Sequence, residues 1–176
     1  MAIETLTIGD PFFRLRILTN EDRHRITGKV IVLNLSDLPI RIREQSLGQL
    51  QSVILNDVDM VGIVHAVIVE GFADHGDDDG LMARIREIWP SAYDVRQEER
   101  LRGIEHYMSP KVWVGQTGFT IYHSASVPLN VGLHRDHAFC PVPGFREVHT
   151  QIVGFGKMQQ CRERDVSTLY LEEPMS

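Results

Sequence analysis

Short runs rich in Val and Ile, each closed by turn-forming residues, recur along this chain and restrict it to a fold built largely from strands. Phe12 to Leu18 alternates apolar and basic side chains, and Lys29 to Leu35 is a β-branched run that begins after Gly28. The longer stretch from Gln51 to Glu70 fits one long strand, two strands broken at Asn56 and Asp57, or a helix, because periodicity does not separate these in short apolar runs.

Two amphipathic segments in the middle of the chain predict helices. Leu81 to Trp89 has apolar residues at helical spacing, follows acidic residues and ends before Pro90. Gln97 to Met108 places Leu101 and Ile104 on one helical face. After Pro110 we expect short strands again, at 112–114, 118–123, 131–134, 147–153, 157–160 and 167–171.

Length and charge narrow the class of protein. The chain has 176 residues, which fits one domain, and its net charge of −6 without a large basic cluster argues against nucleic-acid binding. We find neither a secretory signal nor a run of apolar residues long enough to cross a membrane, and Cys140 and Cys161 are too few for a disulfide framework. These features predict a cytoplasmic protein in a reducing compartment.

Histidines cluster in the second half of the chain. His123, His134, His137 and His149 fall within 27 residues, together with Asp136 and Glu147. On a strand, Glu147, His149 and Gln151 share one face. That face either lines a barrel interior, where a metal or ligand binds, or forms a polar stripe in solvent over Val148 and Ile152.

The spacing around Glu147 resembles the first metal-binding motif of the cupin superfamily. Glu147 is followed after six residues by Gly154 and then Gly156, and His134 and His137 precede it. The resemblance covers residues 131–160. It implies a double-stranded β-helix, or jelly-roll barrel, with a site that binds a divalent Fe, Mn, Ni or Zn ion through His134, His137, Glu147 and His149.

Two features depart from the cupin pattern. The paired histidines are spaced as His134-Arg-Asp136-His137, so a bulge is needed to bring His137 onto the face of His134. The second cupin motif is missing, because the sequence ends at Ser176, about where that motif should begin. Three explanations stay open: the chain is cut short, His149 or His123 fills the vacant ligand position, or the metal has been lost.

The resemblance implies a metal-dependent enzyme for a small polar metabolite, carboxylate or sugar-like, with isomerase, lyase or dioxygenase chemistry. Glu147 and His149 would be catalytic, and Gln151, Tyr122 and Arg146 would contact the substrate. The whole chain is expected to be one mainly β (α+β) domain, with a mixed portion at 1–110, which holds about two helices, and a β-rich metal-binding core at 111–176. A homodimer through the apolar segment 58–69 is also expected.

Two other functions fit the same residues. His134 and Asp136, with His149, match the two-histidine, one-carboxylate site of iron and 2-oxoglutarate oxygenases, although only twelve residues separate Asp136 from His149. A non-enzymatic module that binds or senses a small ligand is the alternative from a different class, and the missing second motif favours it.

Overall fold

The computed structural model of this chain describes residues 2–75, 80–124, 142–154 and 156–175. Strands make up 47% of the structure and helices 16%, which confirms the mainly β prediction. The described strands form one seven-stranded sheet and three separate antiparallel pairs, and they do not close into a barrel. A closed barrel is not formed by the described residues, in which the strands after residue 105 pair only two at a time, and the jelly-roll arrangement stays a prediction.

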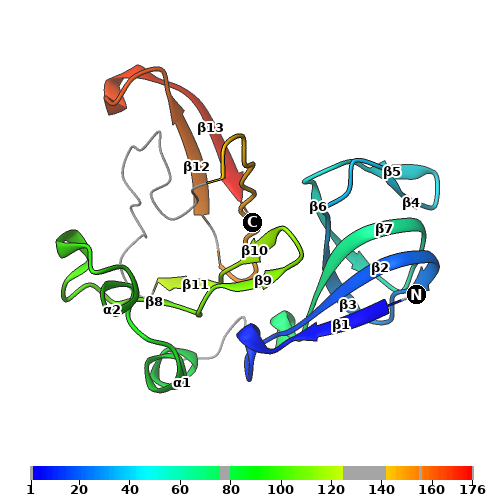
Figure 1. Ribbon diagram of the computed structural model, residues 1–176, viewed down its shortest axis with the longest axis horizontal. Coiled ribbons are helices and arrows are strands. Elements are labelled where there is room, and N and C mark those ends of the chain that lie inside the picture. The colour runs from blue at the N-terminus through cyan, green and yellow to red at the C-terminus, as the bar shows by residue number, and fades with distance from the viewer. Residues whose placement is uncertain (1, 76–79, 125–141, 155, 176) are drawn as a thin grey trace.

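The seven-stranded sheet takes up the first 70 residues (Figure 1). Its strands are β1 (Ala2–Leu6), β2 (Arg14–Arg25), β3 (Lys29–Asn34), β4 (Ile40–Ile42), β5 (Gln45–Leu47), β6 (Ser52–Asn56) and β7 (Asp59–Glu70). The order is β1-β2-β7-β3-β6, and the β4–β5 hairpin joins β7 beside β3. Residues 51–70 form two strands, with Asp57 at a φ of 49° between them, so the broken-strand alternative is confirmed.

The centre of this sheet is buried on both faces. Ile31 and Val69 belong to one apolar cluster, whereas their neighbours Val32 and Ile68 belong to a second cluster on the opposite face. Strands covered on both sides are apolar at every position, which explains the unbroken Val and Ile runs in the sequence. Segment 58–69 uses most of its apolar side chains in these two clusters, so it has little apolar surface left for the predicted dimer contact. The homodimer itself stays a prediction.

The first cluster is completed by helix α1 (Leu81–Ile88), which confirms the first predicted helix. Leu81 and Ile85 are buried on its inner face, and Trp89 follows at its end. The Trp89 ring meets that of Phe12 edge to face, with centroids 5.5 Å apart. These contacts join α1 to the connection between β1 and β2, and Ile121 from the later strands packs into the same cluster.

The second predicted helix, over 97–108, is wrong. Helix α2 spans Ala92–Arg96 and ends at Gln97, whose φ of 57° is left-handed. A single 3-10 turn, η3 (Glu99–Leu101), follows, and Gly103 has a φ of 72°. The chain then forms strand β8 (His106–Met108), because this segment pairs with β11 (Tyr122–Ser124) and buries Met108. Pairing with a distant strand thus overrides the local helical spacing.

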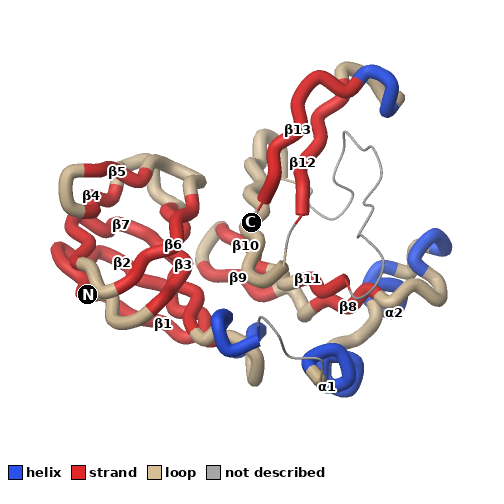
Figure 2. Tube along the Cα trace, turned by 180° about the vertical axis from the view of Figure 1, so that it is seen from behind, coloured by secondary structure: helices blue, strands red, loops and turns tan. Residues whose placement is uncertain are grey.

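The remaining strands form two hairpins. They are β9 (Val112–Val114) with β10 (Thr117–Phe119), and β12 (Gly156–Cys161) with β13 (Leu169–Met175). The remaining 3-10 turns are η1 (Thr7–Gly9), η2 (Phe72–His75) and η4 (Val166–Thr168). Both views show the β12–β13 hairpin extending away from the seven-stranded sheet (Figure 2).

Most strands predicted after Pro110 are present where they can be checked. The predictions at 112–114 and 157–160 are confirmed, and the prediction at 118–123 is divided between β10 and β11. The prediction at 167–171 is confirmed only from Leu169 on, where β13 begins after the 3-10 turn η4. The prediction at 131–134 lies outside the described residues. The predicted strand at 147–153 is wrong, since this segment has no strand partner among the described residues. Neither described helix has the length and apolar character needed to cross a membrane.

Candidate metal-binding site

Glu147 and His149 lie side by side, as their spacing predicts. The distance from Glu147 Oε1 to His149 Nε2 is 3.6 Å, and the two side chains are 42% and 43% exposed. The segment that carries them is irregular, yet Val148 between them is more buried and Ile152 and Val153 pack on the first apolar cluster. The two-residue alternation therefore holds without a strand, because burying the apolar side chains turns the polar ones outward.

The other two predicted metal ligands, His134 and His137, lie outside the described residues, as do Asp136 and Cys140. Within the part of the chain that the structure describes, no three His, Cys, Asp or Glu side chains come together as a metal site. Glu147 and His149 are therefore the two predicted ligands that the structure brings together.

The residues predicted to contact a substrate have different surroundings. Gln151 donates a hydrogen bond from Nε2 to the carbonyl oxygen of Val153, at 2.6 Å, which fixes its side chain locally. Tyr122 is held by Arg96 of α2, which bonds to its hydroxyl and lies 5.2 Å from its ring centre. Arg146 is exposed next to Glu147 in the sequence. Arg146 and Gln151 thus flank the Glu147–His149 pair along the chain, whereas Tyr122 is engaged with α2.

His123 lies on β11 and is half-buried. Burial lowers the pKa of its imidazole, because removal from water disfavours the charged form. A neutral imidazole is the form that binds metals. His123 thus has the protonation state that a substitute ligand requires.

A polar cluster inside the N-terminal sheet was not predicted from the sequence. Arg16 of β2 forms an ion pair with Glu70 of β7, and Glu21 is only 5% exposed. Single buried atoms of Arg16, Glu21, Glu70 and His24 have no hydrogen-bond partner among the described residues. The sequence contains one indication of this cluster, the charged Arg16 between the inward-facing Leu15 and Ile17. The same alternation is expected of a strand whose charged side chains face solvent.

This cluster predicts a loss of stability in mild acid. Burial lowers the pKa of His24, with a further decrease from the positive charge of Arg16, against the opposing effect of Glu21 and Glu70. The unfolded chain therefore binds a proton at a higher pH than the folded chain does, and the contribution of His24 to stability falls as the pH drops below 6.5. Urea unfolding between pH 8 and pH 5 should show this decrease, and His24→Gln should flatten it. A difference between the two proteins that does not change with pH would contradict this assignment.

The chain matches no protein-family model, no curated protein and no solved structure.

Proposed function

We propose that this protein is a metal-dependent enzyme that acts on a small polar metabolite, with Glu147 and His149 as part of the metal site. The observation that carries this proposal is the 3.6 Å approach of the Glu147 carboxylate to the His149 imidazole on an open surface. One carboxylate oxygen with imidazole nitrogens is a ligand set that suits Zn, Fe, Mn or Ni.

The separation of the two groups fits a shared metal. Two ligand atoms that each lie about 2.1 Å from one ion are about 3.4 Å apart at the tetrahedral angle and about 3.0 Å apart at a right angle. The observed 3.6 Å is within a few tenths of an ångström of the first value. Small side-chain rotations would therefore let both groups bind one ion, since both side chains are about 40% exposed.

His134 and His137 are proposed to complete the site. They precede Glu147 by thirteen and ten residues, and the Glu147-x6-Gly154-x-Gly156 spacing supports the cupin-like arrangement. A jelly-roll arrangement of residues 111–176 belongs to the same proposal.

A bound metal would supply Lewis-acid polarisation of a substrate oxygen. Arg146, exposed beside the pair, would bind a carboxylate or hydroxyl of the substrate, and Gln151 would help to orient it. Glu147 or His149 would move the proton in an isomerase or lyase reaction.

Elemental analysis of protein purified without a histidine tag tests the metal site. We expect about one equivalent of Fe, Mn, Ni or Zn per chain in the parent protein, and a decrease of at least tenfold in Glu147→Gln and in His149→Ala. His134→Ala tests the ligand that the structure does not describe. Glu163→Gln, at an exposed position beyond β12, is the matched control and should keep the full metal content.

Two outcomes would contradict the proposal. One is a parent protein without metal after supplementation with each of the four ions. The other is an unchanged metal content in Glu147→Gln and His149→Ala. If the protein binds a small ligand as tightly with EDTA as without it, the result would instead support the non-enzymatic binding module.

A further inference from the structure

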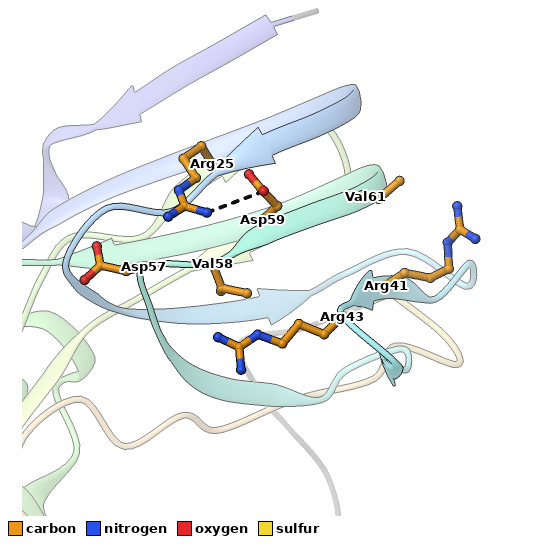
Figure 3. A pocket seen from close by; sticks show the side chains of 7 residues that line it. All are labelled: Arg25, Arg41, Arg43, Asp57, Val58, Asp59 and Val61. Atoms are coloured by element: carbon orange, nitrogen blue, oxygen red, sulfur yellow. Dashed lines mark ion pairs between the residues drawn. The ribbon is translucent and has the colours of Figure 1, made fainter.

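A cavity of about 350 Å³ opens on the N-terminal sheet, in a part of the chain separate from Glu147 and His149 (Figure 3). Its walls come from the end of β2, the β4–β5 hairpin and the start of β7, which are distant in sequence. The lining residues are Arg25, Arg41, Arg43, Asp57, Val58, Asp59 and Val61.

Strand pairing brings Arg25, Asp59, Val61 and Arg41 into two neighbouring rows across β7. Arg25 of β2 lies directly opposite Asp59 of β7, and Val61 of β7 lies between Arg23 of β2 and Arg41 of β4. Directly opposed residues on antiparallel strands have neighbouring side chains. The row through Val61 therefore places arginines on both sides of β7.

The two carboxylates in the cavity already have partners, Asp59 in ion pairs and Asp57 in a hydrogen bond. Asp59 Oδ2 lies 2.7 Å from Arg23 Nη2 and 3.4 Å from Arg25 Nη1. The hydrogen bond from Arg23 lowers the pKa of Asp59, so this carboxylate stays ionised. Asp57 accepts a hydrogen bond from the Gly28 amide at 2.9 Å through Oδ1, which fixes the turn before β3.

Arg41 and Arg43, by contrast, form no ion pair with a carboxylate of the described residues. No carboxylate of the described residues lies within 4 Å of either guanidinium group. Arg43 occupies the two-residue turn between β4 and β5 with a φ of 54°. In Figure 3 its side chain extends toward Val58, with Arg25 beyond Val58, whereas Arg41 extends in the opposite direction.

Charge and shape together point to an anion. With Arg23 included, four guanidinium groups surround two carboxylates, which leaves two positive charges in a chain whose net charge is −6. Guanidinium groups bind phosphate through paired, charge-assisted hydrogen bonds. Val58 is buried and Val61 half-buried, so they supply an apolar wall. A volume of about 350 Å³ suits a small metabolite.

We propose that this cavity binds a small phosphate monoester, with the phosphate dianion between Arg43 and Arg25 and the organic part against Val58 and Val61. Arg41, at the rim, adds positive potential and makes a smaller contribution. Because the attraction is electrostatic and partly exposed to solvent, binding should weaken as salt is added.

Calorimetric titration with phenyl phosphate at low salt tests this site. We expect one saturable site, which binds phenyl phosphate more tightly than inorganic phosphate because of the apolar wall. Arg43→Asn should weaken binding at least tenfold, and Arg41→Gln severalfold. Asn tolerates positive φ, so Arg43→Asn removes the charge without straining the turn. Arg162→Asn, an exposed position on the β12–β13 hairpin, is the matched control and should bind as the parent does.

Asp59→Asn should change the affinity for phenyl phosphate in the direction opposite to the arginine substitutions. It removes the carboxylate that occupies Arg23 and Arg25, so phenyl phosphate should bind severalfold more tightly. Partial unfolding cannot produce this gain. Absence of saturable binding of both phosphates, or equal binding in the parent and Arg43→Asn, would overturn the proposal. Equal affinity for inorganic and phenyl phosphate would overturn the assignment of an organic ligand.

Discussion

Replacement of Asn34 by Ala is expected to lower the free energy of unfolding by about 3 to 5 kcal/mol. Asn34 has no solvent exposure, and its side chain joins three segments. Nδ2 donates to the carbonyl oxygens of Leu38 at 2.9 Å and Leu47 at 3.0 Å, and Oδ1 accepts from the amide and hydroxyl of Ser36, both at 3.0 Å. Truncation removes the Asn34 partner of the Ser36 amide and of the Leu47 carbonyl, whereas the Leu38 carbonyl still accepts from the Ser36 hydroxyl at 2.8 Å. Each buried group that loses its partner costs about 1 to 3 kcal/mol.

The Asn34→Asp variant separates the contribution of hydrogen bonding to stability from that of side-chain volume. The Asp side chain has nearly the same size, but a carboxylate oxygen would face the two carbonyl oxygens that Nδ2 now serves. We expect a loss at pH 7 at least as large as that of Asn34→Ala, with partial recovery in acid, where the protonated carboxyl can donate. Urea unfolding measures both variants. Gln45→Ala, an exposed amide on β5, should change stability by less than about 0.5 kcal/mol. A loss below about 1 kcal/mol in Asn34→Ala would show that this network is not buried as described.

Trp89→Ala is expected to destabilise the protein by about 3 to 5 kcal/mol. Trp89 is 5% exposed and its ring meets that of Phe12 edge to face. Helix α1 has only eight residues, and so short a helix is held by tertiary packing more than by its own propensity. Without the indole, α1 should lose its contact with the sheet. Hydrogen exchange in 81–88 should then increase more than exchange in β2 and β7.

The chain contains a matched control for this substitution. Trp113 is 51% exposed, with Lys111 over its ring, so Trp113→Ala should cost less than about 1 kcal/mol. A double-mutant cycle with Phe12→Ala should give a coupling of about 1 kcal/mol between the two rings. Equal losses in the two tryptophan variants would refute the packing of α1 on the sheet.

Local sequence spacing predicted part of the candidate metal site. The two-residue spacing of Glu147 and His149 was enough to place their side chains together, because the two residues are close neighbours in the chain. The interaction of Tyr122 with Arg96 was not predictable, since it depends on how α2 lies against β11. The arginine-lined cavity was not predictable for the same reason, because it too depends on tertiary structure. Arg25, Arg43 and Asp59 come from three separate segments, and no local pattern relates them.

The sequence by itself determined where several regular elements form. The β-branched run at β3 and the helical spacing of α1 were correct, because steric preference and periodicity act within a few residues. For residues 51–70 the sequence left one strand, two strands and a helix open, and the structure has two strands. Tertiary structure decided the strand order, the burial of both faces of the sheet, and the fate of the segments over 97–108 and 147–153. The helical spacing of the first gave way to pairing between β8 and β11, and the strand alternation of the second found no partner among the described residues. Strand pairing and burial join residues far apart in the chain, so a local pattern cannot reveal whether a partner is present.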